Sequence, residues 1–260
     1  MKKKLIVVGS QGFLGSKICA KLSGTYQLER IPSDIWNLSS LITDNCTVLM
    51  LRAMSSPSYV QQNPQISKEF NVLKTSTLIS ESLQLGAKVI FTSSDVVYGH
   101  DEKLIFTESH SKCPYGIYAE QKSEVENQFI GNPLFFSLRL SLVVGDGSKI
   151  ERILTDESEP KIPIGVVRNP VHYDYVVETI NGLLAYQKWQ DISSTQVLNL
   201  GGKESIDIFD LAQRISRQKK LNAPIPISRT DIDKSSRPTI TRVDSTAAEN
   251  FVNLRFSMKI

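Results

Sequence analysis

The chain has few cysteines and histidines, and neither type is arranged as a ligand set. There are 3 of each in 260 residues. The cysteines lack the C-x-x-C spacing, and Cys19 and Cys46 stand in or beside apolar runs, where a place in the core is expected. No two histidines have the spacing of a metal site. The sequence therefore predicts no bound metal and fits a reducing compartment.

The chain also lacks a large net charge and a long apolar run. A formal net charge of +3 gives no basis for nucleic-acid binding, although it suits an anionic substrate. Apolar runs such as residues 48–51 are far too short to cross a membrane. The lysines and apolar residues at the start soon meet glycine, which argues against a signal peptide. We expect a cytoplasmic globular protein with neither nucleic acid nor membrane as a partner.

The most informative feature that is present is a glycine-rich turn at residues 9–15. It follows the apolar run 5–8 directly and precedes a stretch with helical spacing. Gly9 permits the tight reversal, Gly12 lets backbone N–H groups approach a pyrophosphate, and Gly15 allows close packing of helix on sheet. The spacing is G-x-x-G-x-x-G rather than G-x-G-x-x-G. In its strand-and-helix context, this turn predicts a dinucleotide site with the phosphates at the helix N-terminus.

Strand and helix patterns alternate along most of the chain. Strands are predicted at 5–8, 26–31, 47–51, 88–92, 135–140 and 196–200, and helices at 11–22, 64–85, 115–129, 173–188 and 208–218. Such alternation predicts an α/β protein with a doubly wound, Rossmann-like parallel sheet and ligands beyond the carboxyl ends of the strands. We expect a dinucleotide-binding domain at 1–145. Residues 146–260 should form mostly a small C-terminal substrate-binding lobe, with 170–201 returning to the sheet.

A possible acid–base site follows the glycine turn. Ser94 ends an apolar strand, and Tyr118 and Lys122 are four residues apart on a predicted helix, so that they share a face. A lysine ammonium beside a phenol should lower the pKa of the tyrosine. Tyr118 would then exchange a proton with a carbonyl oxygen that Ser94 holds. Tyr-x-x-x-Lys by itself is often a chance pair, and the order of the parts is what favours catalysis.

Further short motifs accompany these three residues: Asn71-Val72, Asp95-Val96, Glu126, Arg139 to Gly145, Val171 to Asp174, Leu198 to Gly202, and Arg237-Pro238. With them, nearly the whole chain resembles the extended short-chain dehydrogenase/reductases. Within that group it is similar to the dTDP-4-dehydrorhamnose reductases and the NAD-dependent epimerase/dehydratase family of sugar-nucleotide enzymes. The resemblance implies Ser94, Tyr118 and Lys122 as catalytic residues and a homodimer built on the helices predicted at 64–85 and 115–129.

The resemblance also implies the binding residues. Those expected to hold NADP or NAD are Gly9, Gln11, Gly12, Phe13, Leu14, Gly15, Arg30, Asn37, Arg52, Ala53, Asn71, Ser93, Tyr118 and Lys122. Those expected to meet a nucleotide sugar are Ser94, Asp95, Arg139 and Arg237. Arg237 is expected to be the main diphosphate contact.

Some positions depart from the family pattern. The acid expected at the end of the second strand is missing, because Glu29 is too early and Asp34 too late. With Arg30 nearby, this favours NADP over NAD. Asn37 takes the place of the aspartate that faces the adenine. Arg52 replaces a small residue beside the cofactor, where it would either reach a phosphate or point to solvent.

The motifs also favour one type of reaction over others. The Glu of the Thr-Asp-Glu set of nucleotide-sugar dehydratases is absent, since Ser94 and Asp95 are followed by Val96, so water elimination lacks its base. The favoured function is therefore an NAD(P)-dependent reductase of a nucleotide-activated 4-keto sugar. Two alternatives stay open: a nucleotide-sugar epimerase with tightly bound NAD, and a non-catalytic dinucleotide-binding sensor.

Overall fold

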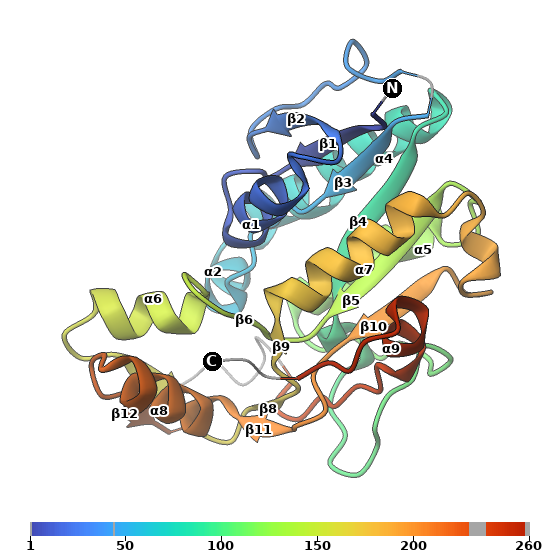
Figure 1. Ribbon diagram of the computed structural model, residues 1–260. Helices are drawn as coiled ribbons and strands as arrows, with labels where there is room; N and C mark the ends of the chain where they lie inside the picture. Colours follow the sequence, from blue (N-terminus) through green and yellow to red (C-terminus); the bar gives the residue numbers. More distant parts are fainter. Residues whose placement is uncertain (1, 44, 229–237, 258–260) are drawn as a thin grey trace.

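A six-stranded parallel sheet forms the centre of the molecule (Figure 1). The structure is a computed structural model that describes residues 2–43, 45–228 and 238–257. The strand order is β10-β5-β4-β3-β1-β2. From β1 the chain passes to β2 on one side and later to β3 on the other, so the order reverses between β1 and β3. The fold is Rossmann-like, which confirms the predicted fold class.

The strands of this sheet are β1 (Lys4–Val8), β2 (Gln27–Ile31), β3 (Thr47–Met50), β4 (Lys88–Ser94), β5 (Phe135–Leu140) and β10 (Val197–Leu200). The helices and helical turns are α1 (Phe13–Leu22), α2 (Pro57–Gln62), α3 (Pro64–Lys68), η1 (Glu69–Leu73), α4 (Lys74–Gln84), η2 (Asp95–Tyr98), α5 (Ile117–Phe129), α6 (Lys149–Asp156), α7 (Tyr173–Ala185), η3 (Trp189–Asp191), α8 (Ile208–Lys219) and α9 (Thr246–Val252). Three two-stranded pairs complete the fold: β6 (Val143–Val144) with β9 (Val171–His172), β7 (Lys161–Pro163) with β12 (Ile225–Ile227), and β8 (Val167–Arg168) with β11 (Ile206–Asp207).

Alternation along the strands divides the core into two layers. In β1, Leu5 and Val7 pack on one face of the sheet, and Ile6 and Val8 pack on the other. The first face is covered by α1, α7 and α9, and the second by α4 and α5 (Figure 1). Both faces of the sheet are buried, which explains why its strands read as continuous apolar runs.

A smaller lobe lies beyond the carboxyl ends of the strands, at the lower left of Figure 1. It contains α6, α8 and the short strand pairs, and it has an apolar cluster of its own that includes Leu154, Ile162 and Leu211. β10 pairs with β5 in the main sheet, and α9 packs against α7. The division into two domains stays a prediction. No helix in the part of the chain that the structure describes is long and apolar enough to cross a membrane.

The predicted helix at 64–85 is interrupted. It consists of α3, one π-helical stretch (η1) and α4, and a separate helix, α2, ends at Gln62, with Asn63 between it and α3. The Lys74 amide donates to the Glu69 carbonyl five residues back, which is the π-helical pattern, and Thr75 Oγ1 donates to the Phe70 carbonyl at 2.9 Å. Leu78 of α4 and Val125 of α5 are buried against the sheet. They are therefore committed to this chain's own core, and the homodimer stays a prediction.

Candidate active site

The predicted site residues gather at the carboxyl ends of the sheet strands. β1 ends at Val8, β3 at Met50 and β4 at Ser94, and the glycine turn, Arg52 and the start of α5 follow beside them. Ligands of open α/β sheets bind in this crevice, where the strand order reverses.

The glycine turn has the close approaches that its sequence predicts. Gly9 has φ +90°, and its amide donates to the Ile31 carbonyl at 2.9 Å. A Cβ on Gly15 would lie 2.2 Å from the Gly9 carbonyl oxygen, so no larger residue fits between the turn and α1. Gly12 is the N-cap of α1 and offers no side-chain acceptor to the first helical turn. The first N–H groups of α1, beginning at Phe13, can therefore bind an anion.

Ser94, Tyr118 and Lys122 come from two elements. Ser94 ends β4, and α5 carries both Tyr118 and Lys122. The Lys122 ammonium lies 5.9 Å from the Tyr118 ring centroid and 4.5 Å from the Phe91 ring centroid, and it donates to the Thr92 carbonyl at 2.7 Å. Helical spacing thus brings tyrosine and lysine to the same edge of the sheet as the serine.

The pKa values of Lys122 and Tyr118 differ from the expectation. Burial lowers the pKa of Lys122 from 10.5 to about 7, against the opposing effect of Glu126. Burial and the negative charge of Asp95 raise the pKa of Tyr118 above its ordinary value of 10.0. The prediction that Lys122 lowers the pKa of Tyr118 is wrong for the protein alone, because the lysine faces the Thr92 carbonyl and is itself desolvated. The phenol is held in its protonated form.

Asp95 lies directly behind Ser94 and is only 2% exposed. Ser94 Oγ donates to Asp95 Oδ1 at 3.1 Å, and Ser141 Oγ donates to Asp95 Oδ2 at 2.7 Å. Arg168 Nε lies 3.8 Å from the same Oδ2, and its other nitrogens donate to the carbonyls of residues 167, 238 and 239. Desolvation raises the pKa of Asp95, although Arg168 and these hydrogen bonds oppose it. Asp95 thus links Ser94 to the lobe.

Arg139 is placed in a buried ion pair. It alternates with Leu138 on β5, so it faces α5, where Nε and Nη2 donate to the two Glu126 oxygens at 3.0 and 2.8 Å. Nη1 donates to the Tyr98 hydroxyl at 2.7 Å, and Arg139 is 3% exposed. Its guanidinium is committed to protein acceptors, so this geometry gives no support to the predicted contact with substrate. Arg237 lies outside the described residues.

The remaining predicted cofactor residues surround the turn. Asn71 is on η1, and its side chain bonds Met54 N, Met54 O and Gln121 Oε1, which fixes the segment that includes Ala53. Asn37 Oδ1 accepts from both N and Oγ of Ser39. The others occupy scattered places: Arg30 is exposed on β2, Ser93 is buried on β4, and Gln11 and Leu14 belong to the glycine turn and the start of α1.

The two aromatic rings around Arg52 were not predicted from the sequence. Its guanidinium carbon lies 4.0 Å from the ring centroids of both Trp36 and Phe70. Nη1 donates to the Ile35 carbonyl at 3.2 Å, whereas Nε and Nη2 are buried with no hydrogen-bond partner. Phe70 belongs to the helical pattern of residues 64–85 and Trp36 to no pattern, and no sequence signal joined either ring to Arg52.

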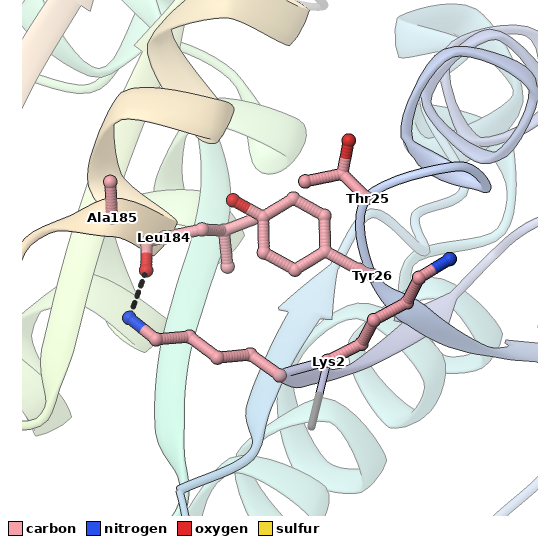
Figure 2. A pocket seen from close by; sticks show the side chains of 6 residues that line it. Lys2, Thr25, Tyr26, Leu184 and Ala185 are labelled. Atoms are coloured by element: carbon pink, nitrogen blue, oxygen red, sulfur yellow. Dashed lines mark hydrogen bonds between the residues drawn. The ribbon is translucent and has the colours of Figure 1, made fainter.

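The residues present fit a dinucleotide. A cradle that side chains at Gly9 and Gly15 would fill adjoins the free N-terminus of α1 and the unpaired donors of Arg52. Another hollow, lined by Tyr26, Leu184 and their neighbours, lies at the amino end of β1, where Lys3 Nζ donates to the Leu184 carbonyl (Figure 2). This hollow therefore lies at the amino ends of the strands, whereas Ser94 lies at the carboxyl end of β4. Within the described ranges, no group of three His, Cys, Asp or Glu side chains could hold a metal ion.

Residues 3–257 match the family model described as the RmlD substrate binding domain. The chain belongs to the RmlD substrate-binding-domain family. This membership confirms the resemblance inferred from the motifs.

Two solved structures share this fold. The dTDP-4-dehydrorhamnose reductase of Bacillus anthracis, in complex with NADP, superposes with a TM-score of 0.80 at 17% identity, covering 97% of this chain and 98% of that one. The UDP-glucose-4-epimerase of Stenotrophomonas maltophila, with bound NAD and formylated UDP-arabinopyranose, gives a TM-score of 0.79 at 17% identity over 99% and 94%. At these identities the likeness shows the fold.

The chain is also similar to a curated relative, the methionine adenosyltransferase 2 subunit beta of Rattus norvegicus. The two are 23% identical over 205 residues, which are 74% of this chain and 61% of that protein. The match thus spans less than two thirds of the relative.

Proposed function

We propose that this RmlD-family protein is an NAD(P)-dependent reductase of a keto group on a nucleotide-activated sugar. The observation that carries the proposal is the placement of Tyr118 and Lys122 on α5 at the strand edge where Ser94 ends β4, beside the glycine turn. A phenol in this position can donate a proton to a carbonyl oxygen.

Each residue of the site has a role in this reaction. Tyr118 donates the proton to the carbonyl oxygen of the sugar. Ser94 Oγ now donates to Asp95, and rotation about its Cα–Cβ bond would direct that proton to the same carbonyl oxygen. Lys122, held by the Thr92 carbonyl, orients the cofactor ribose. When bound, the nicotinamide supplies the hydride.

The choice of a nucleotide sugar as substrate follows from the family membership. The resemblance assigns the diphosphate to Arg237, because a guanidinium reads phosphates well. Arg237→Ala should raise the KM for a nucleotide sugar about tenfold or more and leave cofactor affinity unchanged, as the loss of a charge-assisted hydrogen bond implies.

The test measures turnover of nucleotide 4-keto sugars with NADPH and NADH. Tyr118→Phe should lower kcat about 10²-fold or more, because only the proton donor is lost. Its cofactor affinity should be nearly unchanged. The matched control is Tyr186→Phe at the far end of α7, where the ring is 47% exposed. Near-normal kcat in the Tyr118 variant would refute the assignment.

A second candidate is a non-catalytic dinucleotide-binding subunit. It is favoured by the relative named as the beta subunit of a methionine adenosyltransferase. This candidate predicts cofactor binding without turnover of any nucleotide sugar, and equal behaviour of the wild type and Tyr118→Phe. Tightly held NAD released on denaturation, together with interconversion of sugar epimers, would instead favour the epimerase.

A further inference from the structure

Arg52 is the second residue after β3, where the strand order of the sheet reverses. Its backbone touches the glycine turn, because a Cβ on Gly9 would lie 3.1 Å from the Arg52 amide nitrogen. The side chain is 2% exposed. Arg52 is therefore a buried cation in the crevice that binds ligands in sheets of this kind.

The protein does not compensate this charge fully. One nitrogen, Nη1, donates to the Ile35 carbonyl, and the guanidinium carbon lies over the rings of Trp36 and Phe70. Nε and Nη2 have no hydrogen-bond partner. Burial lowers the pKa of Arg52 to about 10, and the Asp34 charge opposes this only in part. Buried donors without acceptors cost stability, and a group that stays buried in this way calls for an external acceptor.

The position of Arg52 indicates which acceptor it would meet. The pyrophosphate of a dinucleotide belongs over the glycine turn and the N-terminus of α1. Arg52 extends away from there, to Ile35 and Trp36 in the β2–β3 connection. The end of the second strand is where these folds read the 2′ position of the adenosine ribose.

The register of β2 adds a second argument. Glu29 pairs with Ile6, two residues before the end of the strand, and its carboxylate lies 3.5 Å from the Lys4 ammonium. It therefore cannot accept from a 2′-hydroxyl beyond the strand end. Asp34 is the acidic group that faces Arg52 from the connection. An arginine in place of an acid favours a 2′-phosphate.

We propose that Arg52 is the residue that selects NADP(H), by binding the 2′-phosphate with Nε and Nη2 beneath Trp36. The proposal rests on the cofactor site of the proposed function. Trp36 must move aside, and its position permits this: the ring is 39% exposed, and residues 32–38 contain no helix or strand. Phe70, on η1 beside the anchored Asn71, would remain as the fixed face.

The test is calorimetric binding of two probes, adenosine 2′,5′-bisphosphate and 5′-AMP, which differ only in the 2′-phosphate. The wild type should bind the bisphosphate about tenfold or more tightly, as a charge-assisted fork implies. Arg52→Met should lose this preference, and Arg52→Lys should keep part of it. Arg30→Met tests the competing residue, since Arg30 is the other arginine near the strand end, and Arg214→Met, whose ion pair with Glu204 is exposed, is the matched control. Urea denaturation checks that each variant is folded.

Trp36 supplies a second readout. The chain has 2 tryptophans, and Trp189 is fully buried against Phe136. The bisphosphate should change the tryptophan emission of the wild type, and Trp36→Phe should abolish this change.

The outcomes separate the two proposals. Equal affinities of the wild type for the two probes would overturn the role of Arg52, and so would loss of the preference in Arg30→Met but not in Arg52→Met. A protein that keeps the Arg52-dependent preference but turns over no nucleotide sugar would instead refute the reductase and leave the selectivity intact.

Discussion

Helix α5 carries two clusters of buried charge that differ in how the charge is held. Toward its C-terminal half, Glu126 is paired with Arg139 and Lys112, which lowers the pKa of Glu126 and raises that of Arg139. Toward its N-terminal half, the pKa of Lys122 is lowered and that of Tyr118 is raised. One cluster stabilises ions, and the other favours neutral groups.

The difference shows which cluster is structural. Glu126 accepts from Ser137 as well as from its two cations, so both of its carboxylate oxygens are paired within the protein. A fully paired network fixes β5 against α5. Lys122 is one turn and Tyr118 two turns away on the same helix, and there burial disfavours the charged form of each group.

The largest expected effect is on the paired cluster. Arg139→Met should lower the free energy of unfolding by about 3 kcal/mol or more, because Glu126 would lose its bidentate partner in a buried place. The measurement is urea denaturation at neutral pH. Adding Glu126→Gln should recover part of the loss, since no unpaired carboxylate remains. Arg214→Met is the control, as its ion pair with Glu204 is exposed and should contribute less than about 1 kcal/mol. A loss no larger than that of the control would contradict the structural role.

The next effect concerns the pH dependence of stability. The folded pKa of Lys122 is about 7 against 10.5 for an ordinary lysine. Between these values the unfolded chain binds more protons than the folded one, so the Lys122 contribution to stability rises with pH. It is least favourable below pH 7 and levels off above pH 10.5. The unfolding free energy of the wild type minus that of Lys122→Met should therefore increase as the pH rises from 7 to 10.5. A difference that does not vary with pH would refute the lowered pKa.

The smallest effect concerns Asp95 and Tyr118. The Asp95 charge raises the pKa of Tyr118, so Asp95→Asn should lower it, by about one unit. Ultraviolet difference titration of the phenolate measures this directly, with Tyr118→Phe subtracted to isolate the one phenol. If the titration is unchanged, burial alone controls the tyrosine.

Much of the fold could be predicted from the sequence, because its signals are local. The apolar runs and glycine turn defined β1, α1 and the site edge, and the six predicted strands match those of the sheet to within one or two residues. The interruption at η1 could not be predicted, because it depends on how Asn71 bonds to Met54 and Gln121. The register of β2, which separates Glu29 from the strand end, also needed the pairing with β1.

The sequence by itself determined the order of strands and helices, the glycine turn, and the placement of Ser94 at a strand end and of Tyr118 and Lys122 on one helix. These depend on residue spacing, which maps directly onto strand and helix periods. The tertiary structure decided the charge states and the partners. Only packing could show that Arg139 is neutralised by Glu126, that Lys122 is desolvated, and that Arg52 is buried between two rings with free donors. The reason is that desolvation and pairing arise between segments far apart in the chain, where spacing carries no information.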